Sequence, residues 1–197
     1  MGDDKVREEI AFIRSALEQG RAYAHLRSPD FALWGALMAL GYLGTYAFVV
    51  RLWTLSPSVI WWSLVAVGWL FSLFGGRLRL RPEGRAASPA IDALRALWLG
   101  FGVTTVIFAI MQTVGGIEGE WMDTRVAGLL GLCFFASASI TKIRWLRFIA
   151  AGWWGAAVVF FLLHGRAEGL LAGAGFMIVL LCLPGLMLWL RRPAAHG

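Results

Sequence analysis

The stretch HLRSPDFALWGALMALGYLGTYAFVV, residues 25–50, contains about twenty mostly apolar residues that begin just after the pair Ser28-Pro29. A helix of that length and composition can cross a lipid bilayer. The same pair occurs at Ser56-Pro57 and at Ser88-Pro89, each time directly before another apolar run. Serine favours the N-cap of a helix and proline its first turn, so the pairs predict the starts of three helices.

The composition of the whole chain extends this reading. Of its 197 residues 59% are hydrophobic and only 15% are charged, whereas about a quarter of the residues of a soluble domain are charged. The sequence therefore predicts an all-α polytopic membrane protein, a six-transmembrane-helix bundle within residues 29–192, followed by a tail at 193–197. The predicted spans lie at about 30–50, 57–76, 90–114, 125–142, 146–163 and 169–190.

The basic residues predict the orientation of these spans. Fifteen of the 18 Lys and Arg residues lie in the N-terminal segment, in the connections after the second and fourth spans, at the start of the third span, or in the tail. The other three are Arg51, Arg125 and Arg166. By the positive-inside rule both termini are cytoplasmic, and the expected location is the inner (plasma) membrane. The basic side chains would then meet anionic lipid headgroups, and no nucleic-acid partner is expected.

Residues 1–28 are predicted to form an amphipathic helix at the cytoplasmic surface. Its apolar stripe consists of Val6, Ile10, Ile13 and Leu17, at helical spacing. Such a helix lies on the membrane, folds under the bundle, or docks on a partner protein. Small residues four positions apart, at Ala127/Gly131, Ala151/Gly155 and Gly169/Gly173, allow close helix packing, either inside one chain or in a homo-oligomer.

Polar side chains within the spans are few. No residue that titrates at neutral pH lies near the predicted middle of any span, which argues against an ion-coupled transporter. Asp92 and Arg95, one turn apart near the start of the third span, are interpreted as a structural ion pair. A possible polar path is formed by Thr104, Thr105, Gln112, Ser137 and Ser139, and Pro184 predicts a kink in the last span.

Catalytic and cofactor motifs are not apparent. No histidine lies inside a span to bind haem, and no nucleophile or nucleotide motif is present, so neither a cofactor nor enzymatic activity is expected. The weak metal candidates are outer-face residues, namely Glu118, Glu120, Asp123 and His164, which match no established metal motif.

Two functions follow from these patterns as expectations. The first is a non-enzymatic membrane subunit, scaffold or regulator that acts through helix contacts and its N-terminal helix, with a protein partner or a second copy of the chain. The alternative is a transporter or channel for a small or lipid-like solute.

Overall fold

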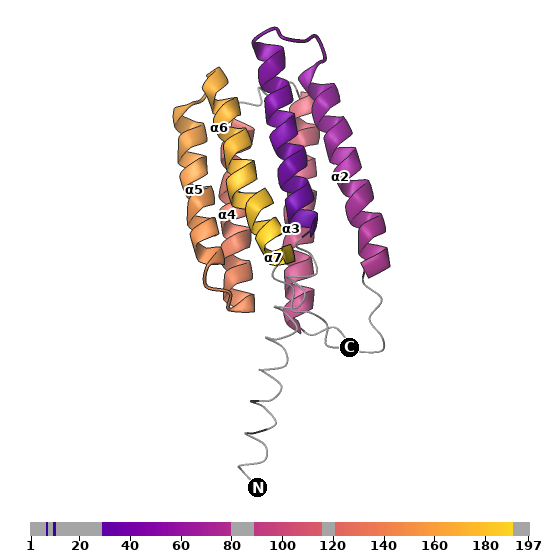
Figure 1. The fold of residues 1–197 in the computed structure, drawn as a ribbon, viewed down its shortest axis with the longest axis vertical. Helices are drawn as coiled ribbons and strands as arrows, with labels where there is room; N and C mark the ends of the chain where they lie inside the picture. Colours follow the sequence, from indigo (N-terminus) through magenta and orange to yellow (C-terminus); the bar gives the residue numbers. More distant parts are fainter. Residues whose placement is uncertain (1–6, 8–9, 11–28, 80–88, 116–120, 191–197) are drawn as a thin grey trace.

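The computed structural model describes residues 7, 10, 29–79, 89–115 and 121–190, and these described parts are helical without a strand. The first long helix, Pro29–Val49, is drawn in indigo in Figure 1. The helices after it are α2 (Pro57–Arg79), α3 (Pro89–Gly115), α4 (Met122–Thr141), α5 (Leu146–Leu162) and α6 (Ala167–Met177), and the chain continues through a short π-helix η2 (Ile178–Cys182) into α7 (Leu183–Leu190). These bounds agree closely with the ranges predicted from the sequence.

Five of the helical segments are long and apolar enough to cross a membrane. They are Pro29–Val49, Pro57–Phe74, Pro89–Val114, Met122–Thr141 and Ala167–Leu190. The α5 helix is also apolar, but it has only 17 residues, near the lower limit for a span. The described part of the chain is thus all-helical, with five helices of membrane-spanning character.

The three prolines open helices as predicted. Helices begin at Pro29, Pro57 and Pro89. At the second of these, the hydroxyl of Ser56 accepts a hydrogen bond of 3.4 Å from the backbone N–H of Val59, as an N-cap serine does. The other two serines lie outside the described residues, as do most of residues 1–28, including three of the four residues of the predicted apolar stripe.

The best-packed part of the molecule is the hairpin of α4 and α5. The turn between these helices places Lys142 in the left-handed conformation, with φ of 57°, and α5 begins at Leu146. The side chains of Ala127, Ala150 and Trp153 between the helices are fully buried. The short basic connection is therefore a tight turn between two antiparallel helices, as the sequence predicts.

The last helical segment changes its winding before Pro184. Proline has no N–H for the carbonyl four residues earlier. The preceding turn is a π-helix, in which the N–H of Leu183 bonds the carbonyl of Ile178 five residues back. The π-turn is the local adjustment that accompanies the proline, where the sequence predicts a kink.

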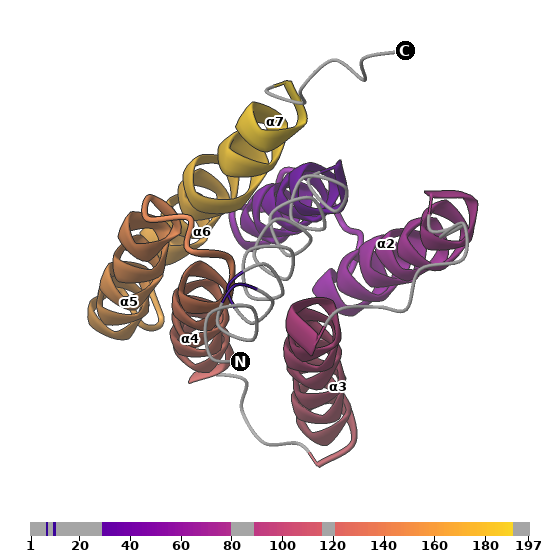
Figure 2. The same ribbon diagram turned by 90° about the horizontal axis from the view of Figure 1, so that it is seen from below.

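The helices form two groups. Figure 2 shows α2 and α3 on one side of the molecule and α4, α5, α6 and α7 on the other. Within the membrane-length windows of α2 and α3 only 11% and 6% of the residues are buried, against 44% in α4. Their exposed residues are mainly apolar, for example Leu70, Leu99 and Ile107. Such surfaces suit a lipid environment, which agrees with the membrane character of the chain.

Candidate functional site

An apolar cavity of about 840 Å³ lies between the two groups of helices. It is lined mainly by the helix Pro29–Val49 and by α2, α3 and α4, with a few residues from the later helices. Ligand pockets in proteins typically have volumes of about 300–1,000 Å³ and mostly apolar walls. The cavity is therefore large enough for a small molecule or a lipid chain.

One face of α4 forms a wall of this cavity. Apart from Met122 at its start, its lining residues recur every three or four positions: Asp123, Val126, Leu130, Phe134, Ser137 and Thr141. This spacing places them on a single side of the helix. The stripe is polar at both ends and apolar between them, and a rise of 1.5 Å per residue separates Asp123 from Ser137 by about 21 Å.

The other three helices carry the same pattern on their cavity faces. The first helix contributes Asp30 near one end and Thr45 near the other, with Trp34 and Met38 between them. The cavity face of α2 has serines near its two ends and three tryptophans between: Ser58, Trp61, Trp62, Trp69 and Ser72. The cavity face of α3 has Arg95 near its start and Gln112 and Thr113 at its end. The site is thus a long apolar chamber with two polar ends.

Aromatic rings form much of its middle. Trp34 donates a hydrogen bond of 3.0 Å to the hydroxyl of Ser72 and meets the ring of Trp69 edge-on at 6.4 Å. On the other side Trp98 packs between Phe31 and Phe134, with ring centroids at 4.9 and 5.3 Å. The Trp34 indole N–H has a partner, so its ring presents an apolar surface.

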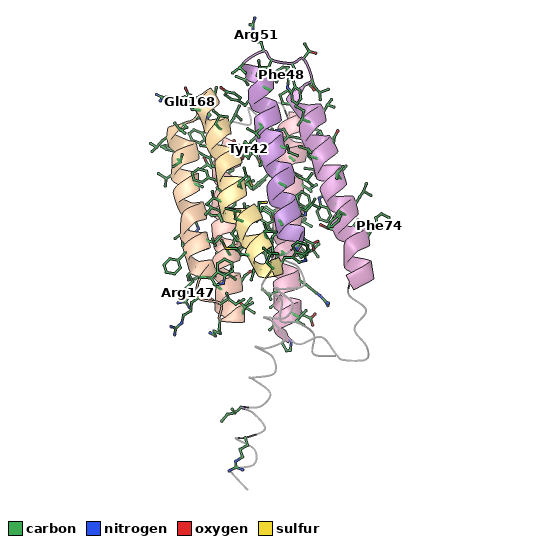
Figure 3. All side chains as sticks on the ribbon, in the orientation of Figure 1. Tyr42, Phe48, Arg51, Phe74, Arg147 and Glu168 are labelled. Carbon is green, nitrogen blue, oxygen red and sulfur yellow. The ribbon has the colours of Figure 1, made fainter. Side chains whose placement is uncertain are left out.

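A tyrosine and an aspartate meet at one end of the cavity. The hydroxyl of Tyr42 donates a hydrogen bond of 2.7 Å to a carboxylate oxygen of Asp123, at the start of α4. The Tyr42 ring stacks on Phe160 and lies against Gly173, where a Cβ would approach the ring to 2.7 Å. Figure 3 shows Tyr42 on the side of Arg51 and Glu168, with Arg147 at the opposite end of the bundle. This end is called the Asp123 end below.

The other end contains Ser137 and Thr141 from the last turns of α4, and it is called the Ser137 end below. Asp30, in the first turn of its helix, and Arg95, in the second turn of α3, also line the cavity. Antiparallel neighbours bring the starts of these two helices to the side where α4 ends. Asp30 is only 8% exposed although its side chain is acidic.

The predicted polar path is brought together in part. Thr105, Gln112 and Ser137 line the cavity, whereas Thr104 and Ser139 are not among its lining residues. The Thr105 hydroxyl bonds the carbonyl of Phe101 at 2.9 Å, so it adds little polarity to the middle of the chamber. Sequence reasoning missed Asp30 and Tyr42. Their spacing from Trp34 and Met38 along one helix face is the signal that would have found them.

The predicted ion pair, docking stripe and metal candidates do not form a second site in the described residues, although Arg95 and Asp123 line the cavity. Asp92 and Arg95 approach to 3.6 Å, with side chains 62% and 41% exposed. Of the predicted docking stripe, only Ile10 is described, and it is 60% exposed. His164 stacks on Trp121 at 4.6 Å, while Glu118 and Glu120 lie outside the described residues. Among the residues that the structure describes, no group of three or more His, Cys, Asp and Glu is suited to a metal.

The small-residue pairs divide between the interior and the surface. Ala127 and Gly131 are buried, and a Cβ on Gly131 would collide with Trp154. Gly173 lies against Tyr42, whereas Gly155 has open space where its Cβ would be, and Ala151 is exposed beside it. The first and third pairs therefore serve packing within the chain.

The sequence matches no protein-family model, and comparisons with curated proteins and with solved structures return no match. The function is therefore argued from the cavity and its lining.

Proposed function

We propose that this chain is a six-span integral protein of the inner membrane that binds, and provides a route for, a lipid-like solute in its cavity. The observation that carries the proposal is the lining pattern. Four helices present polar residues at both ends of one chamber and apolar or aromatic residues over about 21 Å between. An amphipathic molecule with a long apolar chain matches this distribution.

The same lining disfavours a route for inorganic ions. Among the residues that the structure describes, the charged ones that line the cavity are Asp30, Arg95 and Asp123, and all three lie in the first two turns of their helices. An ion in the apolar middle would lose its hydration without a compensating charge. An apolar chain loses nothing there, because it exchanges lipid for aromatic and aliphatic side chains.

Val106 and Val103 on α3 provide a matched test. Val106 lines the cavity, whereas Val103 on the same helix is not a lining residue and is 49% exposed. In the Val106→Trp variant the larger indole side chain should obstruct the chamber and weaken the binding of a lysophospholipid about tenfold or more, which corresponds to a loss of about 1.4 kcal/mol. Binding is measured by native mass spectrometry of the detergent-solubilised protein.

The Val103→Trp variant carries the same substitution on the outer surface and should bind like the wild type. Binding at the wild-type level by both variants would contradict a ligand in this cavity. Loss of binding in both, with unchanged thermal stability, would point to α3 as a whole and not to the chamber.

A second function, a non-enzymatic subunit or regulator, is favoured by the low burial of α2 and α3. Helices with so few internal contacts would gain packing from a partner protein in the membrane. If this is the function, deletion of residues 1–26 should abolish a complex that co-purifies with the full-length chain in mild detergent. A full-length chain that purifies alone would exclude the subunit and leave the lipid-binding proposal standing.

A further inference from the structure

The hydroxyl of Ser137 differs from five other hydroxyls in these helices. Hydroxyl groups in membrane helices usually bond the backbone carbonyl four residues earlier. Such bonds, at 2.7–3.0 Å, are made by Thr45, Thr105, Thr113, Ser139 and Thr141. Ser137 precedes the last two on the same helix, and its Oγ has no hydrogen-bond partner among the residues that the structure describes.

Ser137 is also deeply buried and lines the cavity. The residue is only 6% exposed, and it belongs to the polar end of the α4 stripe. A buried hydroxyl without a partner is costly, so a polar group from outside the chain is the expected partner. At the Asp123 end, by contrast, Tyr42 and Asp123 already bond each other.

We infer that the Ser137 end of the cavity binds the headgroup of a zwitterionic phospholipid. The Ser137 hydroxyl would donate a hydrogen bond to a phosphate or ester oxygen. This inference rests on the proposed function, and it adds the class of lipid and its direction. The acyl chain extends past the aromatic middle toward Asp123.

The charges that line the cavity near this end fit such a headgroup. Arg95 supplies a guanidinium that also lies 3.6 Å from the carboxylate of Asp92, and its planar donors suit a phosphodiester. Asp30 supplies a carboxylate, which suits an ammonium group. One charge of each sign favours a headgroup that itself carries both signs over a purely anionic one.

The matched pair Ser137 and Ser139 tests the inference. The ligands are lysophosphatidylethanolamine, lysophosphatidylglycerol and a monoacylglycerol of the same chain length, titrated into detergent-solubilised protein. Lysophosphatidylethanolamine should bind most tightly. Ser137→Ala should weaken its binding about tenfold to a hundredfold, the usual effect of losing one hydrogen bond to a charged group. Ser139→Ala should leave it unchanged, because that hydroxyl bonds Phe135 on its own helix.

Asp30→Asn should remove the preference for the ethanolamine lipid over the glycerol lipid, since the carboxylate that selects the ammonium group is lost. Unchanged binding in Ser137→Ala, or equal affinity of the wild type for all three ligands, would overturn the headgroup assignment. The Val106→Trp variant distinguishes a failure of the headgroup inference from a failure of the proposed function. If it blocks all three ligands while Ser137→Ala has no effect, the cavity binds lipid and only the headgroup inference fails. If Val106→Trp blocks none, the proposed function itself fails.

Discussion

Replacing Gly35 by alanine is expected to lower the melting temperature of the detergent-solubilised protein by about 5 °C. A Cβ at this position would lie 2.5 Å from the backbone nitrogen of Cys182 and 2.8 Å from its Cα. These are backbone atoms of the π-helix, so no side-chain rotation relieves the overlap. Overpacking of this kind costs about 1–3 kcal/mol, and each kcal/mol corresponds to about 2–4 °C in a chain of this size.

Gly128→Ala is the matched control, because a Cβ at Gly128 would meet no atom within 4 Å. This variant should melt at or slightly above the wild-type temperature, since alanine is the better helix former. Thermal unfolding is followed by circular dichroism for both variants. Gly35→Ala melting with the wild type would show that the first helix and the π-helix do not pack as closely as described.

Cysteines placed in three connections are expected to react with a membrane-impermeant thiol reagent in an all-or-none pattern. In a background without Cys133 and Cys182, Leu52→Cys and Arg166→Cys should react in intact cells, and Arg144→Cys should react only after permeabilisation. All three positions are exposed in the structure. The physical basis is the bias of basic residues, fifteen against three, which favours placing the larger group in the cytoplasm.

The Arg144 and Arg166 positions bracket α5, the 17-residue helix, so they test whether it crosses the membrane. A helix of that length extends about 26 Å, slightly less than the roughly 30 Å hydrocarbon core. Protection of both positions in intact cells would mean that α5 does not cross, and the six-span arrangement would be wrong. The reverse labelling of all three positions would overturn only the orientation.

The helical segments and their ends follow from local features of the chain. In lipid, an apolar run of about twenty residues satisfies its backbone N–H and C=O groups by forming a helix. The prolines at 29, 57 and 89 mark helix starts because their missing N–H is needed least in the first turn. The α4–α5 turn was likewise predictable from a short basic stretch between two apolar runs.

The cavity depends instead on how the helices lie against one another. Hydropathy is nearly the same on every face of an apolar helix. It therefore did not indicate that α2 and α3 lie on one side of the molecule and α4 to α7 on the other, or that Pro29–Val49 packs against the π-helix. Only that arrangement brings Asp123 to Tyr42, 81 positions away in the chain. It also buries Ser137 without a hydrogen-bond partner among the described residues, whereas Ser139 bonds its own backbone. The sequence thus determined which segments are helical and which end of each is polar. The tertiary structure decided which polar residues share a chamber, because that depends on helix rotation and spacing, which contacts between distant residues set.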